Sequence, residues 1–158
     1  MSLRTQTDSY LTFNIEKELF AINVGRVLEI LEIQPITRVP QSPSFMRGVI
    51  NLRGNILPVV DTRMRFSLPG SDFTIDTCIV VLSIENNKEA TLLGVIVDAV
   101  QKVIEIKADQ IYRSTSISSH FKEEYIAGIA KVDEEFIMVL DVDKVFSTED
   151  LLSNSQEN

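Results

Sequence analysis

Short apolar runs separated by polar or Gly- and Pro-containing turns occupy most of this 158-residue chain. Residues 10–15 alternate apolar and polar positions, which is typical of a half-covered strand, whereas 78–84 are almost entirely apolar, which is typical of a strand covered on both faces. The same patterns predict strands at 19–22, 27–33, 49–50, 56–60, 92–97, 103–106, 125–132 and 136–140. Short helical turns are expected after Asn23, at 62–66 and near 141–146, the last extending toward 152. Many short strands with few helical turns predict an all-β fold of the barrel class.

The stretch 48–66 contains the clearest β-hairpin. Two apolar runs flank a connection with Asn and Gly at 51–55, the composition that hairpin turns favour. Pro58 has no N–H to donate, so the second strand is expected at an edge, at a bulge, or with that position facing outward. Arg53 is therefore predicted at the hairpin tip.

This stretch recurs 80 residues later. Residues 48–66 align without a gap with 128–146, and residues 20–33 align with 93–106 at an offset of 73. Each pair shares only four identical residues, but two pairs in the same order at similar offsets indicate two diverged copies of one β module.

A loop at 67–76, which contains Pro69-Gly70, is expected to separate the two copies. We call residues 9–68 the first module and residues 77–141 the second module. The polar tail 153–158 is expected to be disordered.

The strand at 27–33 carries a carboxylate in an apolar row. Strand alternation places Val27, Glu29, Leu31 and Ile33 on one face. Glu29 fits two interpretations: a charge that protects an edge strand from pairing with other chains, or a specificity contact inside an apolar docking patch.

The net charge of −8 is distributed unevenly. Residues 1–70 carry 8 Lys and Arg against 6 Asp and Glu, whereas residues 71–158 carry 7 against 17. Five arginines and no lysine lie between 33 and 71, which favours a protein interface, with a solvated basic face as the alternative. A nucleic-acid partner is disfavoured, because the overall charge repels phosphate and the interleaving of aromatic with basic residues is missing.

The sequence offers little for catalysis. His120 is the only histidine, so a metal cluster built on several histidines is excluded. His120 itself is expected to be a solvated loop residue. Cys78 begins a buried strand and is expected to fill the core. Asp61 and Asp141 occupy equivalent positions before helical turns, as helix caps do. We expect no enzyme activity, no cofactor and no metal.

Cellular location is suggested by what the chain lacks. A single cysteine excludes an internal disulfide and suits a reducing compartment. The first ten residues have no apolar signal core, and no run approaches the roughly 18 apolar residues of a membrane span. We expect a cytoplasmic protein that does not insert into the membrane.

Residues 10 to about 152 resemble the CheW family of bacterial chemotaxis coupling proteins. The signature is GVINLRG at 48–54, then LPVVD at 57–61 and Arg63, supported by VLEI at 27–30 and GVIVD at 94–98. The resemblance implies two small five-stranded β-barrels in pseudo-repeat, the first completed by residues 142–152. It also implies a stand-alone, non-catalytic adaptor. Such an adaptor joins the cytoplasmic tip of methyl-accepting chemoreceptors to the regulatory domain of the histidine kinase CheA and controls the kinase's activity.

The resemblance also implies where the partners bind. The receptor-facing positions of the family fall on Val27, Glu29, Gly48 and Arg53, and we add Asn51 because it lies in the same turn. Arg53 would make charge-assisted contacts to an acidic or carbonyl-bearing groove around an apolar centre at Val27.

The kinase contacts implied by the family are apolar, with one barrel against another. Candidates in the second module are Cys78, Ile79 and Val103, and plain core packing is the alternative for all three. The second module has Asp133 where the first has Arg53, which suggests that only the first hairpin docks on receptors. Segment 112–124 has no motif to which we assign a role.

The other classes considered are a barrel that binds oligonucleotide or a small ligand, and an enzyme. The acidic charge and sparse aromatics count against the first, and the absence of a catalytic constellation counts against the second.

Overall fold

A computed structural model describes residues 7–70, 72–86, 89–112 and 125–146 of the chain. Within these ranges the regular secondary structure is mostly β, as expected. The strands and helical turns, in chain order, are β1 (Thr7–Ile15), β2 (Glu18–Asn23), η1 (Val24–Arg26), β3 (Val27–Glu32), β4 (Met46–Leu52), β5 (Asn55–Asp61), α1 (Thr62–Arg65), β6 (Cys78–Asn86), β7 (Glu89–Val97), β8 (Ala99–Lys107), η2 (Ala108–Gln110), β9 (Ile111–Tyr112), β10 (Ile126–Val132), β11 (Glu135–Leu140) and α2 (Val142–Val145).

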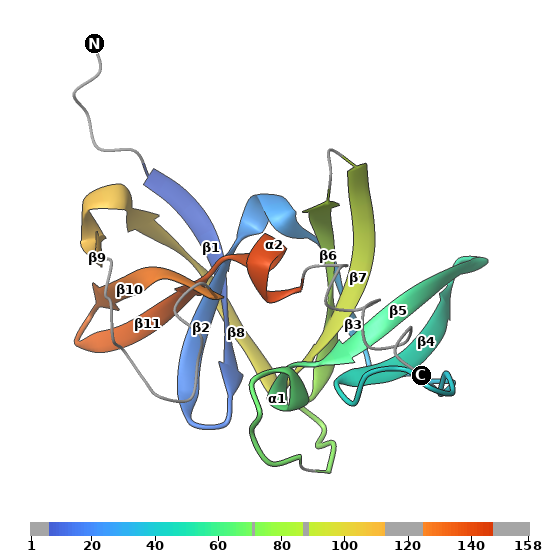
Figure 1. Cartoon of the computed structure of the whole chain (residues 1–158). Coiled ribbons are helices and arrows are strands. Elements are labelled where there is room, and N and C mark those ends of the chain that lie inside the picture. The colour runs from blue at the N-terminus through green and yellow to red at the C-terminus, as the bar shows by residue number, and fades with distance from the viewer. Residues whose placement is uncertain (1–6, 71, 87–88, 113–124, 147–158) are drawn as a thin grey trace.

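The strands form two sheets that lie side by side, with α1 and α2 between them (Figure 1). The six-stranded sheet has the order β8-β1-β2-β11-β10-β9, and the five-stranded sheet has the order β3-β6-β7-β5-β4. The predicted count of five strands holds for one sheet, whereas the two-residue strand β9 adds a sixth strand to the other. In the described part of the chain the end strands of each order do not pair with each other, so the predicted closure into barrels is not confirmed.

The internal repeat is confirmed by the backbone pairing. Gly48 pairs with Val59 in the first hairpin and Gly128 with Val139 in the second, which is the offset of 80. Val59 then lies beside Gly94 in β7, and Val139 lies beside Ala21 in β2, both in parallel pairs. Positions 21 and 94 differ by 73, the second offset, so both offsets place equivalent residues at equivalent points of the two sheets.

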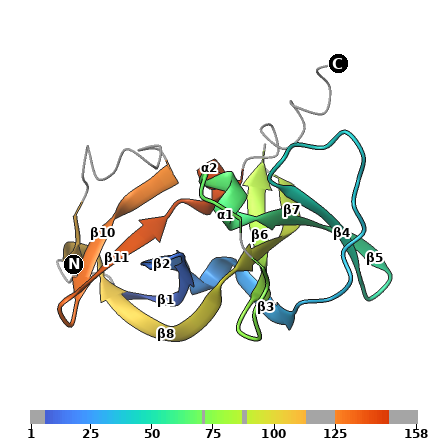
Figure 2. The same ribbon diagram turned by 90° about the horizontal axis from the view of Figure 1, so that it is seen from below.

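Each sheet takes strands from both modules. β1 and β2 of the first module pair with β8 and β11 of the second, and β6 and β7 of the second module pair with β3 and β5 of the first. The sheets therefore do not divide the chain at the loop 67–76, because β1 and β2 lie in one sheet with β8–β11, and β6 and β7 lie in the other with β3–β5. This exchange is visible in Figure 2, where β8 runs from one sheet toward the other.

Three apolar clusters hold this arrangement together. One lies within each sheet, and a larger central cluster includes residues of both sheets and of α2. Strand β6 contributes to two clusters, with Ile79 and Val81 in the cluster of the five-stranded sheet and Val80, Leu82 and Ile84 in the central cluster. The prediction that this strand is covered on both faces is confirmed.

The C-terminal helical turn belongs to the shared core. Val142, Val145 and Phe146 are buried in the central cluster. Residues 147–152, expected to complete the first module, lie outside the described residues, as do the tail 153–158 and all but Tyr112 of segment 112–124. No helix in the described ranges is long and apolar enough to cross a membrane.

Candidate functional site

The tip of the β4–β5 hairpin presents an arginine to solvent. Leu52 pairs with Asn55, so Arg53 and Gly54 are the two turn residues, with φ of +51° and +86°. Two positive φ values are the requirement of the type I′ turn that suits two-residue hairpins. The Asn51 side-chain oxygen accepts a hydrogen bond from the Gly54 N–H at 2.8 Å and fixes the turn. The predicted place of Arg53 is confirmed.

Arg53 is held in position by Glu29. Its two terminal nitrogens donate hydrogen bonds of 2.8 and 2.7 Å to the two carboxylate oxygens of Glu29. These bonds lower the pKa of Glu29 from its ordinary value and raise that of Arg53. The Arg53 side chain remains 68% exposed, so its outer side is accessible to another molecule. The result is an oriented guanidinium group at the surface.

This ion pair also spans the opening of the five-stranded sheet. Glu29 lies in β3 and Arg53 follows β4, and these strands are the two ends of the strand order. The sheet curls until its end strands come within reach of one bidentate contact. We call this opening between β3 and the β4–β5 hairpin the first seam.

Val27 does not share the face of Glu29, so that part of the prediction is wrong. Val27 pairs with Leu82 and Glu29 pairs with Val81, with a shift of register between them. Because directly paired residues point to the same face of a sheet, the shift turns Val27 toward the central cluster. Leu31 stays on the Glu29 side and packs against the cluster of the five-stranded sheet.

Gly48 is buried and does not reach the surface around Arg53. Its φ is +146°, and a Cβ atom at this position would lie 2.2 Å from the carbonyl oxygen of Thr37. Thr37 and Val49 exchange two backbone hydrogen bonds of 2.8 and 2.9 Å, which hold the segment before β4 against that strand. The structure therefore accounts for this glycine by close backbone approach.

The three kinase-facing candidates do not share one surface. Ile79 is fully buried in the five-stranded sheet, and Cys78 is half-buried against the central cluster. Burial raises the pKa of the Cys78 thiol, which disfavours the reactive thiolate. Val103 in β8 is 55% exposed. Core packing thus describes Ile79, whereas Val103 is available to a partner.

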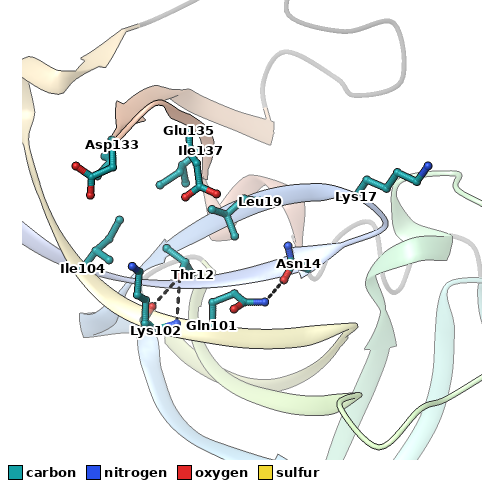
Figure 3. Close-up of a pocket in the computed structure, with 11 residues that line it drawn as sticks. Thr12, Asn14, Lys17, Leu19, Gln101, Lys102, Ile104, Asp133, Glu135 and Ile137 are labelled. Atoms are coloured by element: carbon teal, nitrogen blue, oxygen red, sulfur yellow. Dashed lines mark hydrogen bonds between the residues drawn. The ribbon is translucent and has the colours of Figure 1, made fainter.

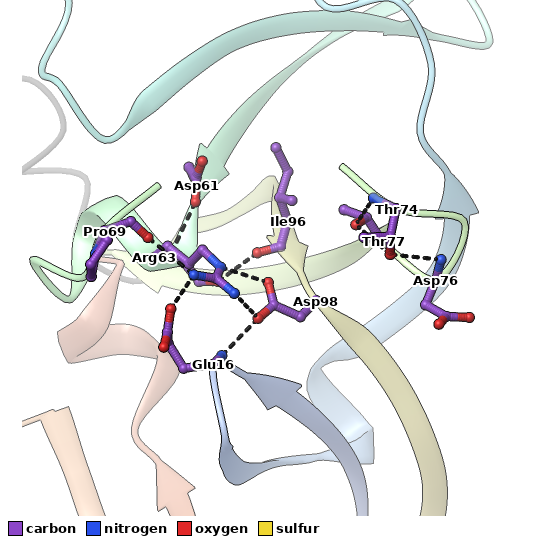
Figure 4. A network of polar contacts seen from close by, with 10 residues as sticks. Glu16, Asp61, Arg63, Pro69, Thr74, Asp76, Thr77, Ile96 and Asp98 are labelled. Atoms are coloured by element: carbon purple, nitrogen blue, oxygen red, sulfur yellow. Dashed lines mark hydrogen bonds and ion pairs between the residues drawn. The ribbon is translucent and has the colours of Figure 1, made fainter. Parts of the chain in front are cut away.

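A polar network at α1 was missed by the sequence interpretation (Figure 4). Arg63 donates two hydrogen bonds to Asp98, at 3.0 and 2.8 Å, and one to the Pro69 carbonyl oxygen, and it also pairs with Glu16. The Glu16 N–H donates to Asp98 at 2.7 Å. Arg63 is only 16% exposed and joins α1 to the β7–β8 and β1–β2 turns. Long-range ion pairs of this kind leave no local signal in the sequence.

The second copy of the repeat, 128–146, takes part in a matching pair with the charges exchanged. Asp143 of α2 stands 80 residues after Arg63, and it pairs with Arg26 of η1 in a bidentate contact. Asp143 also accepts the N–H of Glu85 at 2.9 Å, as Asp98 accepts that of Glu16. The hydrogen bonds from Arg26 lower the pKa of Asp143.

The helical turns are capped as predicted. The Asp61 side chain accepts the N–H of Arg63 at 3.0 Å, and the Asp141 side chain accepts that of Lys144 at 3.3 Å. Both aspartates therefore have a structural role, and Asp61 pairs in addition with Arg47.

Among the described residues there is no group of His, Cys, Asp and Glu that could hold a metal ion. His120 lies outside them. The charged groups described above are engaged with one another and hold the fold, so the accessible chemistry is that of a docking surface around Arg53.

Comparison with known proteins identifies the family and agrees with the fold. The family model described as CheW-like domain matches residues 9–150. A chemotaxis protein CheW from Klebsiella aerogenes is 30% identical over 93% of this chain and 86% of its own length, and one from Thermotoga maritima is 33% identical over 85% of each. The crystal structure of the scaffolding protein TtCheW from Thermoanaerobacter tengcongensis superposes with a TM-score of 0.80 at 30% identity, covering 90% of this chain and 94% of that one.

Proposed function

The chain belongs to the family of CheW-like domains, and we propose that it couples methyl-accepting chemoreceptors to the histidine kinase CheA. Proteins of this family are non-enzymatic scaffolds of bacterial chemotaxis, and this chain is one of them. Coupling requires one surface for the receptor tip and another for the regulatory domain of the kinase. Control of the kinase then requires that one receptor state binds more tightly than the other.

The receptor surface is centred on Arg53. The observation that supports this most directly is the bidentate Arg53–Glu29 pair, which fixes the guanidinium orientation while leaving 68% of the Arg53 side chain exposed. A fixed arginine loses less conformational entropy on binding than a free one, so it is suited to recognise carbonyl or carboxylate groups on receptor helices. Exposed Ile56 pairs with Asn51 beside the tip and adds apolar area.

The other receptor-facing positions support this surface from within. Asn51 fixes the turn, Gly48 permits the close packing behind β4, and Val27 anchors β3 to the central cluster. Substitutions at Gly48 and Val27 would weaken receptor binding by displacing Glu29 or the hairpin.

The kinase surface would lie on the second module, with Val103 as its exposed apolar contact. Cys78 and Ile79 lie in β6 of the other sheet, so they would act only indirectly, through core packing. The two modules then serve different partners, and the protein acts in the cytoplasm, recruited to membrane-bound receptor arrays. With a net charge of −8, a nucleic-acid partner is not part of the proposal.

Binding of a chemoreceptor cytoplasmic fragment and of the CheA regulatory domain to four purified chains tests the proposal. The chains are wild type, Arg53→Glu, Glu29→Arg and the double exchange. We expect at least about tenfold weaker receptor binding for Arg53→Glu, with kinase binding unchanged.

The double exchange separates two roles of Arg53. It restores an ion pair across the first seam but leaves a carboxylate at the tip. Continued loss of receptor binding would support direct contact by Arg53, whereas recovery would mean that the pair only maintains the fold. Lys107→Glu, an exposed change at the end of β8, serves as the charge control. If wild type bound neither partner, the coupling proposal would be wrong.

A further inference from the structure

The six-stranded sheet contains a pocket at the place that corresponds to the first seam. The pocket has a volume of about 450 Å³ and lies between β8 and the β10–β11 hairpin, over β1 (Figure 3). Small-molecule sites typically have volumes of roughly 300–1,000 Å³ and often lie at the mouths of barrel-like sheets. In the five-stranded sheet the corresponding opening is bridged by Arg53 and Glu29. We call the opening in the six-stranded sheet the polar pocket.

The polar pocket carries charges at the positions equivalent to this ion pair, with the signs exchanged. The offset of 80 places Asp133 at the position of Arg53, and Asp133 is the first residue of the β10–β11 turn, with φ of +50°. The offset of 73 places Lys102 at the position of Glu29. A cation thus replaces the anion of β3, and an anion replaces the cation of the hairpin tip.

These charges do not meet across the polar pocket. In the described part of the chain, Lys102 forms no ion pair with Asp133 or with Glu135, the second carboxylate of the pocket. Figure 3 shows both carboxylates on the hairpin wall and Lys102 on the β8 wall, with Lys17 pointing away from the pocket. The equivalent charges that close the first seam are therefore held apart here, so an anionic wall faces a cationic wall.

Hydrogen bonds along the floor of the polar pocket fix the base of Lys102. The buried Thr12 hydroxyl donates to the Lys102 carbonyl oxygen at 2.8 Å and accepts the Lys102 N–H at 3.2 Å, where the register of β1 and β8 shifts. Asn14, also in β1, accepts a hydrogen bond from the Gln101 side-chain amide. These floor groups are paired with one another, so the charged side chains are what the polar pocket offers to a ligand.

We propose that the polar pocket binds a small zwitterion of the α-amino-acid class. Its ammonium group is held by Asp133 and Glu135, and its carboxylate is held by Lys102, in charge-assisted hydrogen bonds. A ligand with a charge of only one sign would leave one wall without a counter-charge, whereas a zwitterion satisfies both walls at once. Neither a chemoreceptor nor a kinase takes part, so this proposal stands or falls separately from the proposed coupling function.

Apolar surface completes the site. Leu19, Ile104 and Ile137 line the same pocket, with Ile137 buried and the other two half-buried, and they offer a place for an apolar side chain of the amino acid. Bound in this way, the ligand connects β8 to the β10–β11 hairpin, as the ion pair of the first seam connects β3 to the β4–β5 hairpin. The charged groups belong to exposed residues, so the affinity is expected to be weak, with a Kd of about 0.1–10 mM.

L-Leucine is the first probe, because it carries both charges and an apolar side chain. Amide chemical shifts of the isotope-labelled full chain are followed by NMR at low salt, where exposed charges are least screened. We expect saturable shifts around the pocket residues of β1, β8 and the β10–β11 turn, and none around Arg53 and Glu29, whose charges already pair. Leucinamide lacks the carboxylate and N-acetyl-leucine lacks the ammonium group, so both should bind at least about threefold more weakly.

Two pocket variants and one control complete the test. Lys102→Met removes the cation, and Asp133→Asn with Glu135→Gln removes the anions, so each chain should bind L-leucine at least about threefold more weakly than wild type. Lys107→Met, an exposed change at the end of β8 outside the pocket, should bind as wild type does, and circular dichroism confirms that each chain is folded. The proposal would be overturned by the absence of saturable shifts in wild type up to about 50 mM L-leucine, by equal binding of either blocked derivative, or by unchanged affinity in the pocket variants.

Discussion

Replacement of Gly48 by alanine tests whether this residue acts in docking or in the fold. The family resemblance places Gly48 among the receptor-facing positions, whereas the structure buries it behind β4. Two penalties are expected. Alanine at φ of +146° is strained by about 1–3 kcal/mol. Its Cβ would also lie 2.2 Å from the Thr37 oxygen, so the two Thr37–Val49 hydrogen bonds must lengthen or break, at about 1 kcal/mol each.

The sum is a loss of about 3–5 kcal/mol in the free energy of unfolding, a large share of the 5–15 kcal/mol typical of domains. Two other glycines separate the contributions. Gly54 has φ of +86° and no atom within 4 Å of an added Cβ, so Gly54→Ala reports strain alone and should cost about 1 kcal/mol. At Gly128 no positive φ is involved, but an added Cβ would meet the Ile111 side chain at 2.5 Å, so Gly128→Ala reports crowding that a side chain can partly relieve.

Urea unfolding of the three variants, monitored by circular dichroism, gives these free energies directly. We expect the loss for Gly48→Ala to exceed each of the other two by at least about 1 kcal/mol. Receptor binding, measured where the variant is still folded, should fall together with stability. If Gly48→Ala kept wild-type stability but lost receptor binding, the structural explanation would be refuted and a direct contact would take its place.

Three other predictions follow from the ion pairs and the cysteine. Arg63→Ala should lower the free energy of unfolding by about 2 kcal/mol, because it leaves the partly buried Asp98 without its bidentate partner; a loss below about 0.5 kcal/mol in urea unfolding would contradict this. The pKa of Asp143 in the folded chain lies below its ordinary value of 3.8, so the stabilisation from this carboxylate is present above that pH and is lost as pH falls through the folded pKa. The thermal midpoint of Asp143→Asn should therefore fall less than that of wild type between about pH 5 and about pH 2. Parallel curves for the two proteins would count against the pair with Arg26. Cys78 should react with a maleimide at least about tenfold more slowly in the folded chain than in urea, and equal rates would show that its burial is not maintained.

Local chemistry explains why part of the site could be predicted from the sequence. A hairpin tip depends on a few adjacent residues, so the turn with Arg53 and Gly54 could be predicted from the sequence. The same holds for the aspartate caps before α1 and α2. The repeat could be detected in the sequence because equivalent positions keep similar residues at a fixed offset. Strand alternation likewise predicted that Glu29 and Leu31 share a face.

Pairing between distant strands explains the rest. Alternation shows which residues of a strand face inward but does not identify the neighbouring strand. The exchange of β1–β2 and β6–β7 between the modules therefore could not be foreseen. The bulge before Glu29 inserts one residue without a glycine or proline to mark it, and it turned Val27 to the opposite face. The Arg53–Glu29 contact joins residues 24 positions apart and depends on the curl of the whole sheet.

The exchanged strands also give a reason for the reversed polarity of the two inner ion pairs. Two diverged copies of one module could pair their strands within themselves or across, and apolar β patterns alone discriminate poorly between such registers. Arg63 lies in the repeat copy 48–66 and meets Asp98, whereas Asp143 lies in the copy 128–146 and meets Arg26. Both arginines therefore come from the first half of the sequence and both aspartates from the second half. If each half paired only with itself, neither arginine would meet the aspartate that it contacts in this structure. The polarity of these contacts thus favours the interlocked arrangement, on which the first seam and the surface around Arg53 depend.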